Sequence, residues 1–248
     1  DVRESVIGWM EESKVREDEG RDYLIDTIYS PETLGKIRDP RVDINDSIFN
    51  TRTEIEKYTN TLVEFPETKA LDILESEKKE LLREKLTDIL ASENGVGAAK
   101  QFLATLKSYL HTCKREMEAE AAELEQQKTN KKQGVDRALK EYEEYCNRSF
   151  LRRTDRGKEE HLGEVAVAAK STLKTAIEIK RREAARDIFI ALLSEVDRYV
   201  LQISAMDQLL DNLSREYTDC LADAEHEKGS TVFEYDLSYN ERANMQFN

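Results

Sequence analysis

Residues 164–228 contain neither glycine nor proline, and this run constrains the fold more than any other feature of the chain. Through much of it, apolar residues recur at steps of three and four, which places them on one face of an α-helix. A helix of this length would extend for roughly 100 Å at about 1.5 Å per residue. The run therefore predicts one very long helix, several times longer than a compact fold of this chain would be wide.

The strictest part of the repeat is residues 196–224, where the apolar steps alternate between three and four. This spacing is the heptad pattern of a coiled coil. We call this stripe of residues the strict seam. Its members are Val196, Tyr199, Ile203, Met206, Leu210, Leu213, Tyr217, Cys220 and Ala224.

A second apolar seam follows the glycine-containing break at residues 92–97. It resumes after Gly134, and because one glycine costs only about 1 kcal/mol in a helix, we expect a bend there and not an end. The apolar residues of this second helix are Leu103, Leu106, Leu110, Cys113, Met117, Leu124, Val135, Leu139, Tyr142 and Cys146.

Residues 147–158 are the one plausible point of reversal between the two long helices. Neither helix can bury its stripe alone, so we expect them to pair antiparallel, with residues 98–127 opposite roughly 180–210. The strict seam is longer than one partner helix covers. We therefore expect its far end to pack also on helices before residue 95.

The remaining segments complete an all-α prediction. Residues 1–94 predict a small helical bundle, with a loop at 31–40 and a helix at roughly 67–92 that follows Pro66. The antiparallel coiled-coil hairpin protrudes from it over residues 95–229. In the tail, residues 230–248, the alternation of Phe233, Tyr235, Leu237 and Tyr239 with polar residues predicts either a short strand or an extended segment.

Composition excludes several classes of function. The formal charge of -14 argues against general binding to nucleic acid or anionic lipid, because both require a basic face. No apolar stretch approaches a membrane span and no signal peptide opens the chain, so we expect a cytoplasmic protein. The opening without methionine, inside a helical pattern, suggests a piece of a longer polypeptide. Cys113, Cys146 and Cys220 are odd in number and far apart, which favours reduced packing residues over disulfides.

No motif in the chain predicts a catalytic, cofactor or metal site. His111, His161 and His226 are too widely spaced for a short metal motif. The glycines at 95 and 97 precede a helix, but they lack the spacing and the preceding strand of a phosphate-binding loop. We therefore expect a protein that is not an enzyme and has no cofactor.

The clearest local anomaly is the basic turn, residues 147–158, where five basic residues accompany a single acidic one. A cationic tip could dock an acidic partner, including an acidic flank of another copy. Alternatively, these side chains complement the end of a helix and cover apolar neighbours. Phe150 and Leu151 either close the hairpin end or form an exposed contact. The candidate partner-binding residues are Arg148, Arg152, Arg153, Arg156 and Lys158.

The order of elements in residues 66–225 resembles the helical region of large bacterial tubulin-like proteins, in which a GTPase domain precedes long helices. The resemblance is carried by GVGAAKQFLATLKSYL (95–110), a charged helical run, RSFLRRTDRGKEEHL (148–162) and another long helix. It implies a helical accessory part of a filament-related protein, with the nucleotide site elsewhere. The glycine-rich GGGTG-type loop is absent from this chain, so the resemblance assigns no nucleotide-binding residue.

Two functional hypotheses remain. The first is a structural or interaction module whose coiled-coil arm serves self-association or docking to a protein partner. The second is a crescent-type helical dimer that shapes membranes, which would require Lys180, Arg181, Arg182, Arg186 and the basic turn to gather on one concave face.

Overall fold

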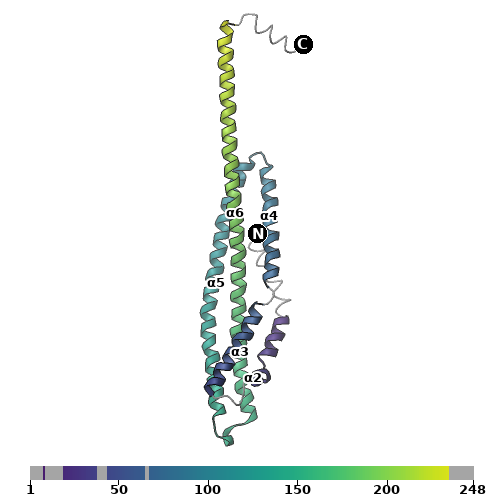
Figure 1. The fold of residues 1–248 in the computed structure, drawn as a ribbon, viewed down its shortest axis with the longest axis vertical. Helices are drawn as coiled ribbons and strands as arrows, with labels where there is room; N and C mark the ends of the chain where they lie inside the picture. Colours follow the sequence, from purple (N-terminus) through teal and green to yellow (C-terminus); the bar gives the residue numbers. More distant parts are fainter. Residues whose placement is uncertain (1–7, 9–18, 38–43, 65–66, 235–248) are drawn as a thin grey trace.

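The computed structural model describes residue 8 and residues 19–37, 44–64 and 67–234, which form an elongated array of helices along one axis (Figure 1). Two helices dominate it: α5 (Gly95–Cys146) and α6 (Asp155–Glu234). Within these ranges the regular structure is helical throughout, with no strand, which confirms the predicted all-α fold. None of the helices in the described part of the chain is both long and apolar enough to cross a membrane.

The predicted antiparallel hairpin is present. The chain ends α5 at Cys146, passes through a short 3₁₀ helix (Phe150–Arg152) and begins α6 at Asp155, so it reverses within the predicted turn. Two ion pairs fix the register of the helices. Lys107 Nζ lies 2.5 Å from Asp197 Oδ1, and Arg182 Nε lies 2.9 Å from Glu120 Oε2. Residues 98–127 thus lie opposite roughly 180–210, as predicted.

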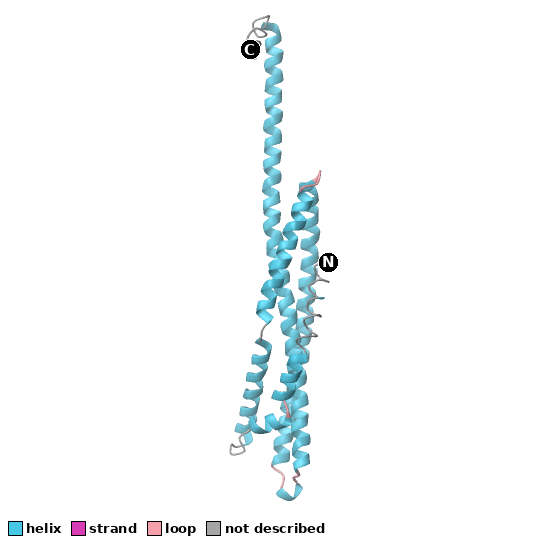
Figure 2. Ribbon diagram, turned by 90° about the vertical axis from the view of Figure 1, so that its right-hand side faces the viewer, coloured by secondary structure: helices cyan, strands magenta, loops and turns pink. Residues whose placement is uncertain are grey.

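The hairpin carries two separate apolar clusters along its length. In the first, α4 (Glu67–Leu90) packs against the first half of α5 and the middle of α6. In the second, the helical residues 19–28, α2 (Pro31–Ile37) and α3 (Ile44–Glu64) pack against the end of α5 and the start of α6. The helices before residue 95 therefore lie alongside the hairpin (Figure 2). The division of the chain into domains at residues 94 and 229 stays a prediction.

The far end of the strict seam does not behave as predicted. Residues 208–226 are all exposed, whereas we expected them to pack on helices before residue 95. The reason lies in the turn between α4 and α5. Lys100 pairs with Asp207, which places this turn close to the level of residue 210 in α6. The last part of α6 consequently projects alone beyond α4 and α5 (Figure 1).

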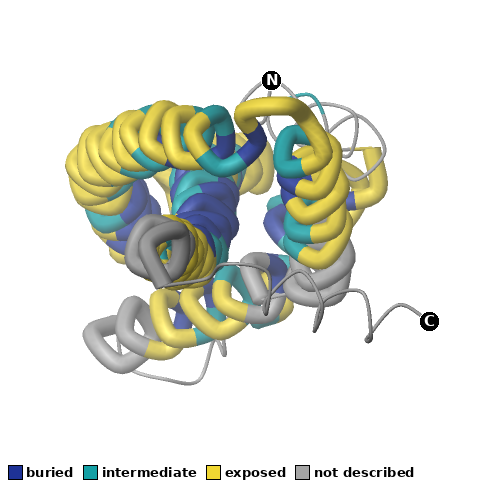
Figure 3. The backbone as a smooth tube through the Cα atoms, turned by 90° about the horizontal axis from the view of Figure 1, so that it is seen from above, coloured by how far each residue is buried: buried dark blue, intermediate teal, exposed yellow. Residues whose placement is uncertain are grey.

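Viewed along the long axis, the buried residues face the space between the helices and the exposed residues cover the outside (Figure 3). α5 continues through Gly134, and α6 continues through Gly229 to Glu234. Phe233, the first residue of the predicted strand, is thus helical. Tyr235, Leu237 and Tyr239 lie outside the described residues.

Candidate interaction site

A run of apolar residues stays exposed near and beyond the point where α6 projects past α4 and α5. The exposed fractions of the large side chains among them range from 37% at Met206 to 67% at Tyr217. Heptad positions earlier in the same helix are buried, with exposed fractions of 0% at Val196 and 4% at Ile203. We call the exposed stripe the projecting seam. It comprises Met206, Leu209, Leu210, Leu213, Tyr217, Cys220, Leu221 and Ala224.

The same heptad pattern of α6 is thus buried in one part of the helix and exposed to solvent in the next. Between residues 196 and 203, α4 and α5 cover the heptad positions of α6. Beyond Met206 the pattern persists, but the described residues provide no covering helix. An amphipathic helix normally gains its stability from packing its apolar face. The projecting seam therefore has the composition of an interface that one copy of the described chain leaves unfilled.

An open groove of about 700 Å³ between α4 and α6 leads into the seam. Met206 lines the groove and is also the first residue of the exposed stripe, so the two surfaces are continuous. The groove also carries three basic and two acidic side chains. These are Lys79, Arg83, Arg198, Glu80 and Glu195.

The basic side chains of the groove are paired with carboxylates: Arg83 with Glu80, Arg198 with Glu195, and Lys79 with Glu75 beside the groove. A hydrogen bond from Arg198 lowers the pKa of Glu195 below its usual value, against the opposing effect of partial burial. Burial and the nearby Glu195 carboxylate raise the pKa of Tyr199. Glu195 is thus held ionised at neutral pH. A general acid would instead need a raised carboxyl pKa, so this arrangement suits a binding surface better than proton transfer.

The basic turn is built around Tyr145, a buried residue at the end of α5. Its hydroxyl accepts a hydrogen bond from the Thr154 N–H at 2.7 Å and donates to the Thr154 carbonyl oxygen at 3.1 Å. Thr154 in turn caps α6, because its Oγ1 accepts the Gly157 N–H at 3.0 Å. A side chain at Gly157 would place Cβ 2.3 Å from the Tyr145 hydroxyl. These contacts join the two helices at the tip.

The five predicted partner-binding residues lie together in the basic turn and are all exposed. Three of them also make intramolecular contacts. Arg153 Nη1 donates to the Cys146 carbonyl oxygen at 2.9 Å, and Arg156 Nε lies 3.1 Å from Glu160 Oε1. The Arg148 guanidinium lies 5.4 Å from the centre of the Tyr145 ring. Arg152 and Lys158 complete the exposed cationic surface.

Leu151 does not close the hairpin end, because 93% of its surface is exposed. Tyr145 takes that structural role through its hydrogen bonds to Thr154. The side chain of Phe150 lies outside the described residues. Leu151 is therefore an exposed apolar side chain within the basic turn, which agrees with the second of the two alternatives that the sequence left open.

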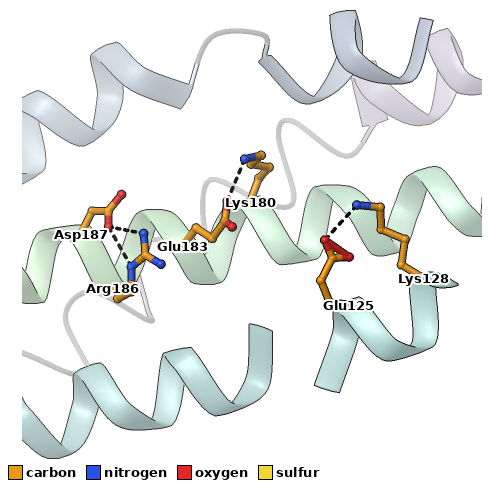
Figure 4. Close-up of polar contacts among 6 residues, drawn as sticks. All are labelled: Glu125, Lys128, Lys180, Glu183, Arg186 and Asp187. Carbon is orange, nitrogen blue, oxygen red and sulfur yellow. Dashed lines mark hydrogen bonds and ion pairs between the residues drawn. The ribbon is translucent and has the colours of Figure 1, made fainter. Parts of the chain in front are cut away.

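The basic residues in the middle of α6 are paired with carboxylates. Figure 4 shows Lys180 directed at Glu183 and Arg186 at Asp187, and the corresponding atoms lie 2.8 Å and 2.7 Å apart. Arg182 contacts Glu120 and Glu178, and Arg181, which is buried, contacts Glu178. These positive charges are consequently neutralised along the rod.

The histidines give no metal centre within the described ranges, where no group of three or more His, Cys, Asp or Glu side chains could hold an ion. His161 lies in the first turns of α6, beside the basic turn. Its ring centre lies 4.8 Å from that of Tyr145, and its Nδ1 lies 3.1 Å from Glu164 Oε2.

Sequence reasoning identified the heptad residues of the projecting seam but assigned them to the wrong neighbours. It also missed Leu209 and Leu221, which widen the exposed stripe. A signal was available, because the hairpin register places the start of α5 close to residue 210 of α6. Every heptad position after that residue lacks a partner in the hairpin.

Comparison of the chain with models of protein families, with curated proteins and with solved structures finds no match.

Proposed function

We propose that this chain is a non-catalytic structural module whose helical arm mediates assembly or docking to a protein partner in the cytoplasm. The projecting seam is the observation that carries the proposal. Eight apolar residues on one helix stay exposed, although the same pattern is buried where α4 and α5 are present. Contiguous exposed apolar surface of this kind is typical of protein interaction sites.

The basic turn provides a second contact region at the opposite end of the hairpin. Its exposed cations, together with Leu151, suit an acidic protein surface. The resemblance to the helical region of large bacterial tubulin-like proteins extends the proposal to a role beside a filament. It contributes no residue to the interaction site.

Membrane shaping has no comparable support. That function requires unpaired positive charge on one concave face, whereas Lys180, Arg182 and Arg186 each contact a carboxylate. Anionic lipid would have to displace these carboxylates from their partners.

The proposal can be tested by cross-linking in the cells that make the protein. A variant with Leu210→Gln and Leu213→Gln removes apolar surface from the seam without burying a polar group. A control with Asn212→Gln and Ala222→Gln changes the opposite face of the same helix. We expect the seam variant to lose the cross-linked species of the wild-type chain and the control to keep them. Identical species in both variants would contradict a role for the seam.

A further inference from the structure

We infer that the projecting seam pairs with the same seam of a second copy of this chain, with the two α6 helices antiparallel. This inference rests on the proposed function and names its partner. The starting observation is continuity: Val196, Tyr199 and Ile203 pack within the chain, and the same heptad register continues through Ala224. A second copy supplies a helix with the matching repeat.

The sizes of the seam residues select the antiparallel direction. The stripe begins with large side chains at Met206 and Leu210 and ends with small ones at Cys220 and Ala224. Parallel pairing would set small against small at one end and would place two Tyr217 rings in one layer. Antiparallel pairing sets each large residue against a smaller or complementary one, which keeps the layers similar in volume. The layers are Met206 with Ala224, Leu210 with Cys220, and Leu213 with Tyr217, each formed twice.

The groove between α4 and α6 supports the same direction. In this register, residues after Ala224 of one copy continue past Met206 of the other and enter its groove. A parallel partner would instead bring its own α4 and α5 against those of the first copy, because both bundles would lie on the same side of the pair. The antiparallel partner places its bundle at the far end.

One flanking contact opposes the pairing. In the antiparallel register, Glu216 of each copy lies beside Glu216 of the other, close to the two-fold axis. Like charges at this position weaken a coiled coil. Glu216→Gln is therefore expected to tighten the dimer, and added salt is expected to have the same effect on the wild-type chain.

Cross-linking of the purified full chain with a short bis-maleimide tests the direction of the pairing. The experiment uses a Cys146→Ser background, in which Cys220 is the accessible cysteine because Cys113 is buried. The antiparallel register separates the two Cys220 residues by about 15 Å along the axis but brings residue 210 against Cys220. We expect little cross-linking of this background and efficient dimer formation with Leu210→Cys. Leu210→Cys combined with Cys220→Ser should lose the cross-link. Thr218→Cys, on the outer face, serves as the proximity control.

Sedimentation velocity over a range of concentrations shows whether the dimer exists. Dimers are expected to weaken at least tenfold with Leu210→Gln and Leu213→Gln, and also with Thr87→Trp, which fills the groove at an exposed position. A parallel pair would cross-link through Cys220 alone and would overturn the inference, as would a dimer with any other cross-linking pattern. A chain that stays monomeric while seam-dependent association persists in cells would overturn only the self-pairing. If the purified chain is monomeric and seam-dependent association in cells is also absent, the proposed function is overturned as well.

Discussion

Two glycines of α5 should respond in opposite directions to the same substitution. A Cβ atom at Gly95 would lie 2.3 Å from the Leu90 carbonyl oxygen and 2.8 Å from Leu90 Cα, whereas nothing lies within 4 Å of a Cβ at Gly134. The atoms that obstruct Gly95 belong to the backbone at the end of α4. They cannot rotate away as a flexible side chain could, so the turn between α4 and α5 would have to open by about 1 Å to restore ordinary contact.

The magnitudes follow from two competing effects. Alanine in place of glycine stabilises a helix by about 1 kcal/mol, and Gly134→Ala should realise this gain in full. At Gly95 the same preference is opposed by overpacking, which typically costs about 1–3 kcal/mol. The difference between the two effects leaves a net destabilisation by Gly95→Ala of up to about 2 kcal/mol. For a chain of this size, 1 kcal/mol corresponds to a change in Tm of about 2–4 °C.

Urea and thermal denaturation, followed by circular dichroism, would measure both changes. Hydrogen exchange adds a local measurement, since Gly95→Ala should speed exchange in α4 while the cluster around Leu173 and Tyr29 keeps its protection. If Gly95→Ala raised the stability as much as Gly134→Ala, the close approach of the turn to Gly95 would be refuted.

Three further substitutions address the core, an ion pair and the tip. Leu110→Ala should lower the free energy of unfolding by about 2–5 kcal/mol in urea denaturation, because this side chain is fully buried; a loss below 1 kcal/mol would contradict that burial. Arg198→Gln should raise the pKa of Glu195 toward its ordinary value of 4.5, measured by NMR titration. The pairing stabilises the fold above that value and is lost as pH falls through the lowered pKa, so the variant should lose less stability in acid than the wild-type chain. Tyr145→Phe should cost about 1–2 kcal/mol and speed exchange of the Thr154 amide, which loses its acceptor; unchanged exchange would argue against this contact.

The long helices and their pairing could be predicted from the sequence because their signals are local. The heptad steps of α5 and α6 specify a helical face, and a single short break at residues 147–158 leaves one place to reverse. Counting outward from that break gave the register that Lys107 and Asp197 confirm. The spacing of the apolar residues and the lengths of the two helices are therefore enough to predict the geometry of the hairpin.

The environment of the projecting seam could not be read from the same pattern. Ile203 and Leu210 occupy equivalent heptad positions, yet the first is buried and the second is half exposed. The difference depends on where α4 ends, which is a tertiary property. The role of Tyr145 was missed for a similar reason: its hydroxyl meets Thr154 only after the chain has turned.

The proposed antiparallel pair would separate the two contact regions of the chain. Each basic turn lies at the end of its hairpin that is remote from the projecting seam (Figure 1). Pairing through the seams would place the two turns at opposite ends of one rod, roughly 190 Å apart at about 1.5 Å per residue. This distance is many times the Debye length of about 8 Å at physiological ionic strength, so the turns would bind acidic surfaces independently. Self-pairing at the centre would thus convert a chain with one basic turn into a rod that can bridge two partners.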